Sequence, residues 1–160
     1  MSRLPALGPR GEGWLAIQIV LMVAVFIACF GAARGSLPAV RLPYGTLAGV
    51  ALFVVGLIMV AVARIQLGGA WTALPRPVAG GQLAQQGIYS VVRNPIYDAV
   101  ILFGIGGSLV TGSVGGLILT AVLAAFLVLK AHREEAWLRQ QYPGYDDYAR
   151  RVKRFIPAIY

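Results

Sequence analysis

The chain has 160 residues, of which 58% are hydrophobic and 12% are charged, and its formal net charge is +8. The length predicts a single domain, and the composition is too apolar for an ordinary soluble one. The net charge alone could indicate a nucleic-acid partner, but the apolar residues form long uninterrupted blocks, which indicates an integral membrane protein instead.

Two blocks in the first part of the chain have the length of a membrane-spanning helix. After a short polar lead, the residues from Trp14 to Ala33 carry no charge, and Gln18 is their main polar interruption. A turn over Gly35–Pro43 separates them from a second uncharged block. Because about 20 apolar residues cross a hydrocarbon core as a helix, we predict helices over Trp14–Ala33 and Gly45–Arg64.

The next segment, Gln66–Gln86, contains glycine and proline pairs that prevent a long helix, so we predict an irregular linker. Pro95 suits the first turn of the following helix because it lacks a backbone N–H. The uncharged residues from Ala99 to Leu129 are too many for one span, and Thr111-Gly112-Ser113 lies near their middle. We therefore predict a hairpin of two helices, Pro95–Val110 and Ser113–Gln140.

The chain closes with a basic tail. Pro143-Gly144 ends the last helix of the hairpin, and Tyr145–Arg154 is predicted to lie against the membrane as a short amphipathic segment, with apolar residues at helical spacing. These residues are Tyr145, Tyr148, Val152 and Phe155. The predicted fold is an all-α integral membrane protein with about four transmembrane helices. It divides into an N-terminal two-helix membrane region, residues 1–65, and a second region, residues 66–160, with the linker, hairpin and tail.

The positions of the cations predict the orientation, because Lys and Arg near helix ends favour the cytoplasmic side. With four spans, both termini and the linker share one side, which holds all of the 14 Lys and Arg residues except Arg34 and Arg41. We therefore predict a multi-pass membrane protein with cytoplasmic termini. Its basic tail is expected to contact anionic lipid headgroups, and no nucleic-acid partner is predicted.

Few residues have an obvious catalytic role. His132 and Cys29 are the single residues of their types, so no metal site, Ser-His-Asp triad or catalytic thiol is predicted. Gly104-Ile105-Gly106-Gly107 lies in an apolar run and indicates helix packing rather than nucleotide binding. Lys130 and Glu134 share a helix face, which by itself is typical of an ordinary exposed pair.

Asp98 falls one turn inside the third helix, where an acidic group is costly unless it is paired or faces water. Two interpretations stay open. The carboxylate either lies at the membrane interface, alone or paired with Arg93, or it is part of a functional pocket.

Several short motifs follow one another in a fixed order. Gly87-x-Tyr89-x-x-x-Arg93-Asn94-Pro95-x-Tyr97 precedes the apolar hairpin, and Arg133-Glu134-Glu135-x-x-Leu138, Tyr145-x-x-Tyr148-x-x-Arg151-Val152 and Ile156-Pro157 follow it. This series, over about residues 66–157, resembles the isoprenylcysteine carboxyl methyltransferase family and its relatives, which include phospholipid methyltransferases. The first two helices match only as generic spans.

The resemblance implies a methyltransferase core with S-adenosyl-L-methionine as methyl donor and S-adenosylhomocysteine as product. The cofactor pocket would lie at the cytoplasmic interface, between the linker and the ends of the hairpin helices. Lys130 falls where the family places an arginine on the substrate side, and Asn94 stands where a histidine is usual, so Asn94 cannot act as a titrating base. The predicted catalytic residues are Lys130, Arg93 and Asp98. The implied cofactor-binding residues are Gly81, Gln82, Leu83, Ala84, Tyr89, Asn94, Pro95, Ile96, Tyr97 and Glu134.

A carboxylate acceptor is ionised at pH 7 and needs no general base, so the enzyme would contribute orientation and exclusion of water. We therefore predict methylation of a lipophilic acceptor that enters from the bilayer, such as the carboxylate of a prenylated cysteine. A phospholipid amine or a small thiol is the alternative acceptor, and an amine would need Asp98 or Glu135 as base. The other alternative is a non-catalytic small membrane protein, such as a four-helix transporter or an assembly factor.

Overall fold

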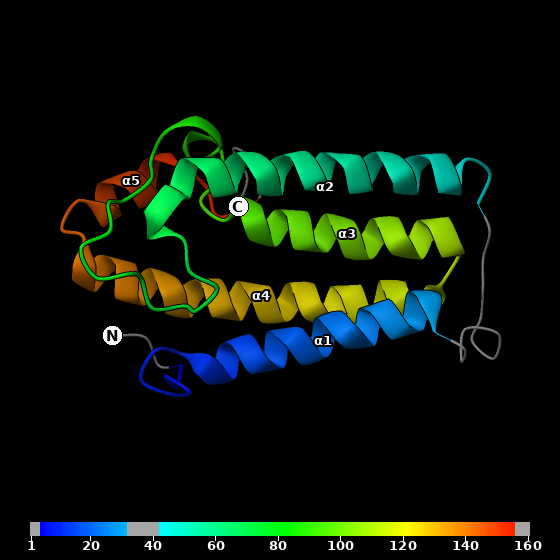
Figure 1. Ribbon diagram of the computed structural model, residues 1–160, viewed down its shortest axis with the longest axis horizontal. Helices are drawn as coiled ribbons and strands as arrows, with labels where there is room; N and C mark the ends of the chain where they lie inside the picture. The colour runs from blue at the N-terminus through cyan, green and yellow to red at the C-terminus, as the bar shows by residue number, and fades with distance from the viewer. Residues whose placement is uncertain (1–3, 32–41, 156–160) are drawn as a thin grey trace.

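Four long helices lie side by side along one axis, and the linker and a short fifth helix gather at one end of them (Figure 1). The computed structural model describes residues 4–31 and 42–155. Within those ranges the chain is helical without a strand, as predicted, and Val92 and Lys153 form an isolated parallel bridge. The helices are α1 (Glu12–Phe30), α2 (Gly45–Leu67), α3 (Pro95–Thr111), α4 (Val114–Gln141) and α5 (Tyr145–Arg151), with 3-10 turns η2 (Gly68–Ala70) and η3 (Gly87–Ser90).

The predicted hairpin is confirmed at its turn. Gly112 ends α3 in the left-handed conformation, with φ of 68°, which glycine adopts without steric cost. Ser113 then caps α4, because its hydroxyl oxygen accepts a hydrogen bond from the Gly116 N–H at 3.0 Å. The predicted ends of the other helices shift slightly: α2 continues past Arg64 to Leu67, and α1 begins at Glu12. The turn over residues 35–41 and the predicted end of the first helix at residue 33 lie outside the described residues.

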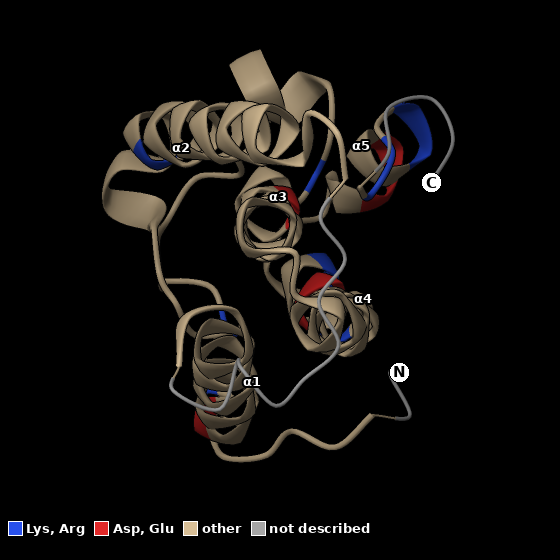
Figure 2. Cartoon of the chain, turned by 90° about the vertical axis from the view of Figure 1, so that its right-hand side faces the viewer, with Lys and Arg blue, Asp and Glu red and all other residues tan. Residues whose placement is uncertain are grey.

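The central helix of the bundle is α3, which contacts all three of the others (Figure 2). Its glycines permit this close approach. A Cβ on Gly106 would lie 2.7 Å from the Gly49 carbonyl oxygen of α2, and a Cβ on Gly104 would lie 2.5 Å from Thr120 Oγ1 of α4. Gly107 faces α1. The prediction that this glycine run serves helix packing is therefore confirmed.

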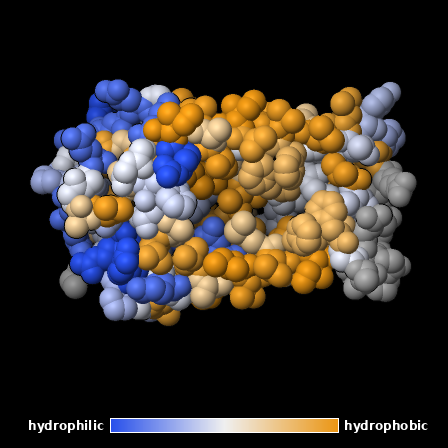
Figure 3. Space-filling model, viewed as in Figure 1, coloured by the Kyte–Doolittle hydropathy of each residue, from blue (hydrophilic) through white to orange (hydrophobic). Residues whose placement is uncertain are grey.

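Apolar side chains cover the middle of the molecule on the face shown in Figure 3, and polar side chains gather at the linker end. Three helices in the described residues are long and apolar enough to cross a membrane: α1, α2 together with the turn after it, and α4. The shorter α3 has 17 residues, which rise about 26 Å at 1.5 Å per residue. That is slightly less than the roughly 30 Å hydrocarbon core, so α3 is the arm of the hairpin whose length is least sufficient to cross a membrane.

Candidate active site

A cavity of about 250 Å³ lies at the linker end, among the linker, the ends of the helices and α5. At this end the linker crosses between α2 and α4 (Figure 1). All of the predicted cofactor-binding residues except Gly81 line it, and so do Lys130 and Arg93. Gly81 lines a second cavity of about 450 Å³ that shares Gln82, Leu83 and Ala84 with the first.

The wall formed by η3 and the start of α3 is held by hydrogen bonds to distant parts of the chain. Gly87 takes a positive φ of 58°, and the next residue, Ile88, donates its N–H to Gln66 Oε1 at 3.0 Å. Asn94 precedes the first turn of α3, and its side-chain amide donates to the Arg154 carbonyl at 3.2 Å. The motif that begins at Gly87 therefore connects the end of α2 to the C-terminal segment.

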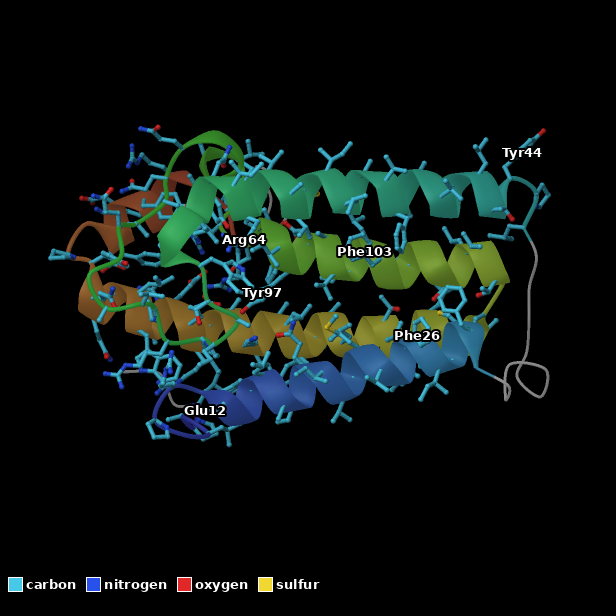
Figure 4. The ribbon with its side chains drawn as sticks, in the orientation of Figure 1. Glu12, Phe26, Tyr44, Arg64, Tyr97 and Phe103 are labelled. Carbon is cyan, nitrogen blue, oxygen red and sulfur yellow. The ribbon has the colours of Figure 1, made fainter. Side chains whose placement is uncertain are left out.

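The floor of the cavity joins α3 to α4 through a tyrosine and a glutamate. The Tyr97 hydroxyl, which points from α3 toward α4 in Figure 4, donates to Glu134 Oε2 at 2.7 Å. One turn earlier on α4, the Lys130 ammonium lies 5.3 Å from the centre of the Tyr97 ring. An acidic and a basic side chain thus face the same cavity around one aromatic ring.

Lys130 is 1% exposed, although it carries a charge. Its ammonium donates to Gln18 Oε1 of α1, and to the Ala73 carbonyl of the linker at 3.3 Å. No carboxylate in the described part of the chain lies within ion-pair distance of it. Gln18 was not among the predicted site residues, and the available signal was its position as a lone polar residue in an apolar span.

The neighbouring glutamate has a different environment. Glu135 is 1% exposed and accepts hydrogen bonds from Arg154 at 2.8 Å and from Arg93 at 3.0 and 3.2 Å. Arg93 also donates to the Ala149 and Val152 carbonyls at 2.6 and 2.7 Å. Arg93 therefore lines the cavity, while its guanidinium attaches the C-terminal segment to α4.

Asp98 is half-buried on α3, one residue after Tyr97, and it is not among the residues that line the cavity. In the described residues Arg93 pairs with Glu135, not with Asp98. The interpretation of Asp98 as the ion-pair partner of Arg93 is therefore wrong. The structure does not bring the three predicted catalytic residues together, because only Lys130 and Arg93 reach the cavity.

Two aromatic residues of the tail, Tyr145 and Tyr148, line the cavity, whereas the sequence predicted that they face the membrane. These side chains are buried inside the protein, with Tyr145 at 1% and Tyr148 at 3% exposure, because they pack against Leu83 and Leu138. The prediction that this face lies against the membrane is thus wrong for these side chains. Burial raises the pKa of Tyr148 to about 12, so its hydroxyl stays protonated and donates to the Tyr89 carbonyl at 2.6 Å.

The linker is tied to the end of α4 by two hydrogen bonds. The Tyr142 hydroxyl donates to the Gly81 carbonyl at 2.8 Å, and the Gln141 amide donates to the Val78 carbonyl at 2.8 Å. Tyr142 and Trp71 both line the cavity, and neither was predicted. Tyr142 and Trp71, which belong to none of the motifs in the sequence, therefore complete the wall of the cavity.

The model of the phospholipid methyltransferase family matches residues 44–144, which run from the start of α2 through α4. A comparison with curated proteins found no match. The matched range contains most of the cavity wall, including Lys130 and Glu134, and leaves out α1 and α5. Since it also covers more than half of the 160 residues, the chain belongs to the phospholipid methyltransferase family of membrane methyltransferases.

Proposed function

We propose that the protein transfers a methyl group from S-adenosyl-L-methionine to the carboxylate of a lipophilic acceptor, such as a prenylated cysteine. The observation that carries this proposal is the pair of opposite charges in one cavity, Lys130 and Glu134. The cation suits an anionic acceptor, and the carboxylate suits a cationic donor.

The residues in the cavity fit this cofactor. Glu134 offers a carboxylate to an ammonium or sulfonium group, and the Tyr89 and Tyr97 rings offer faces that attract cations. Gln82, Leu83 and Ala84 line the linker side of the cavity. When bound, the cofactor supplies a methyl group whose bond to sulfur breaks as its bond to the acceptor oxygen forms, leaving the neutral thioether S-adenosylhomocysteine.

Each cavity residue then has a role that needs no proton transfer. Lys130 binds and orients the acceptor carboxylate, which is already ionised at pH 7. Tyr97 orients Glu134 through their hydrogen bond. Arg93 is a positioning residue, since its bonds to Glu135 and to the tail carbonyls hold the wall in place. The linker excludes water from the reacting groups.

A phospholipid amine is the second candidate acceptor, and the family description favours it. An amine must lose a proton before or during methyl transfer, so this reaction needs a base. Glu135 is engaged by Arg93 and Arg154, and Asp98 does not line the cavity. Neither of the two carboxylates considered as a base for an amine is therefore free in the cavity, which supports the carboxylate acceptor. A requirement for Asp98 in turnover, without an effect on cofactor binding, would instead support the amine.

We also propose that the cavity end faces the cytoplasm. The Lys and Arg residues of the described ranges lie on the segments that meet at that end: the N-terminal lead, the end of α2, the linker, the second half of α4 and the tail. This asymmetry supports a cytoplasmic position by the positive-inside rule. Cofactor would then enter from the cytoplasm, and the lipophilic acceptor would enter from the bilayer.

The proposal is tested by calorimetric binding of S-adenosylhomocysteine to the detergent-purified protein, comparing wild type with Glu134→Ala. We expect wild type to bind and the variant to lose binding, because it lacks the cavity carboxylate. Asp147→Ala, which removes an exposed carboxylate outside the cavity, is the matched control and should bind like wild type.

Binding that survives in Glu134→Ala would contradict the assigned site. Folded wild type that fails to bind S-adenosylhomocysteine would contradict the cofactor, and it would favour a non-catalytic member of the family.

A further inference from the structure

We propose that Gln18 of α1 is a positioning residue that makes the site selective for an anionic acceptor, by holding the Lys130 ammonium with a neutral carbonyl. This inference rests on the proposed function, since it concerns the acceptor side of the same cavity. It assigns acceptor selection in part to α1, a helix outside the range that matches the family.

The geometry around Gln18 directs its carbonyl at the lysine. Gln18 lines the cavity, and its amide nitrogen donates to Met22 Sδ, one turn further along α1, at 3.7 Å. The amide oxygen is thereby left to accept from Lys130 Nζ. A glutamine in an otherwise apolar part of α1 thus has both ends of its amide occupied, one by its own helix and the other by α4.

The hydrogen bond between Gln18 and Lys130 matters because it leaves the charge of the lysine without an opposite charge in direct contact. An ammonium has three N–H donors, and the described partners, Gln18 Oε1 and the Ala73 carbonyl, are both neutral. A third donor is therefore available to a ligand, and among the described residues no carboxylate lies within ion-pair distance of the ammonium. A buried charge is costly without an opposite charge, so the site favours an anionic group next to Lys130. A carboxylate at position 18 would supply that charge from within the protein instead.

The position of α1 near Gln18 is fixed by two contacts that precede this residue in the chain. On the N-terminal side, Arg76 of the linker donates its guanidinium to the Pro9 carbonyl at 3.0 Å. Within α1, the Trp14 ring lies 5.5 Å from the Phe126 ring of α4. The placement of Gln18 opposite Lys130 therefore depends on α1, the linker and α4 together.

The experiment uses Gln18→Glu, which keeps the shape of the side chain and adds a negative charge beside Lys130. We expect at least a tenfold higher KM for N-acetyl-S-farnesylcysteine, because the internal ion pair competes with the acceptor carboxylate. The affinity for S-adenosylhomocysteine should stay within twofold of wild type. Gln140→Glu, an exposed position on α4 outside the cavity, is the matched control and should leave both values unchanged.

A second variant, Gln18→Met, removes the carbonyl without adding a charge, and we expect a smaller rise in KM than for Gln18→Glu. An unchanged KM in Gln18→Glu beside an active wild type would overturn the inference alone. A parallel loss of S-adenosylhomocysteine affinity in Gln18→Glu would also overturn it, by placing Gln18 in the fold or the cofactor site. Wild type that binds S-adenosylhomocysteine but does not methylate the farnesylcysteine would overturn the proposed acceptor, and the inference with it.

Discussion

Two glutamates that are adjacent in sequence, Glu134 and Glu135, have different roles because the helix turns successive side chains by about 100°. Glu134 faces the cavity and accepts a hydrogen bond from Tyr97. Glu135 faces away from it and is bound by Arg93 and Arg154. At the scale of single residues, the first carboxylate is therefore available to a ligand, and the second is part of the framework.

Replacing the framework carboxylate should destabilise the protein strongly. We expect Glu135→Ala to lower the free energy of unfolding by about 3–5 kcal/mol, because it leaves the nearly buried Arg93 without its carboxylate. Unfolding of the purified protein in detergent measures the change. Asp147→Ala, which breaks an exposed pair with Arg150, should cost less than about 1 kcal/mol. Equal losses in the two variants would contradict the role of Glu135.

At the scale of helices, the bundle depends on how closely α2 approaches α3. The contact is made by glycines on both helices: Gly49 and Gly56 of α2 are buried against α3, where Gly106 lies opposite Gly49. Small residues allow such an approach in membranes, where lipid competes equally for apolar side chains. The separation of α2 from α3 also sets where Pro95–Tyr97, at the start of α3, stands in the cavity wall.

A single methyl group added to the contact between α2 and α3 should destabilise the protein. In Gly49→Ala the Cβ would lie 2.5 Å from the Gly106 carbonyl oxygen, which is backbone and cannot turn aside. We expect the free energy of unfolding in detergent to fall by about 1–3 kcal/mol, as for other overpacked interiors. Gly69→Ala adds a methyl group that meets nothing within 4 Å, so it serves as the control. A loss no greater in Gly49→Ala than in Gly69→Ala would show that the helices can separate freely.

At the scale of the whole molecule, segments from both ends of the chain enclose one cavity. The N-terminal lead contacts the linker through Arg76, and the tail contacts η3 where the Tyr148 hydroxyl donates to the Tyr89 carbonyl. The bridge between Val92 and Lys153 continues this contact toward α3. The site is thus complete only when the tail is folded onto the linker end.

Removing the hydroxyl of Tyr148 should weaken this closure. We expect Tyr148→Phe to lower the free energy of unfolding by about 1–3 kcal/mol, because it leaves the Tyr89 carbonyl without its partner. Burial raises the pKa of Tyr148 to about 12, above the ordinary value near 10, so the hydroxyl is stabilised in its protonated form. The difference between wild type and variant should therefore be constant below about pH 9 and shrink as the pH rises from 10 to 12. Detergent unfolding at pH 7, 9 and 11 measures this, and a difference that grows with pH would contradict it.

The sequence by itself determined the order and type of the elements. Helix length in a membrane follows from the number of apolar residues, and helix ends follow from local conformation, as with Pro95, Gly112 and Ser113. These are properties of neighbouring residues, so they do not require knowledge of the fold. The motif series, in turn, indicated most of the residues that line the cavity, because those residues lie in the elements that the motifs begin or end.

Only the tertiary structure decided which side chains meet. Gln18 and Lys130 are 112 residues apart, and helical periodicity shows which face each occupies but not which helix lies opposite. The same limit explains the tail: Tyr145 and Tyr148 share an apolar face that suits a membrane or a protein interior equally, and the structure buries it against the linker. An amphipathic pattern records that a face is buried, whereas its partner is set by packing between elements distant in the chain.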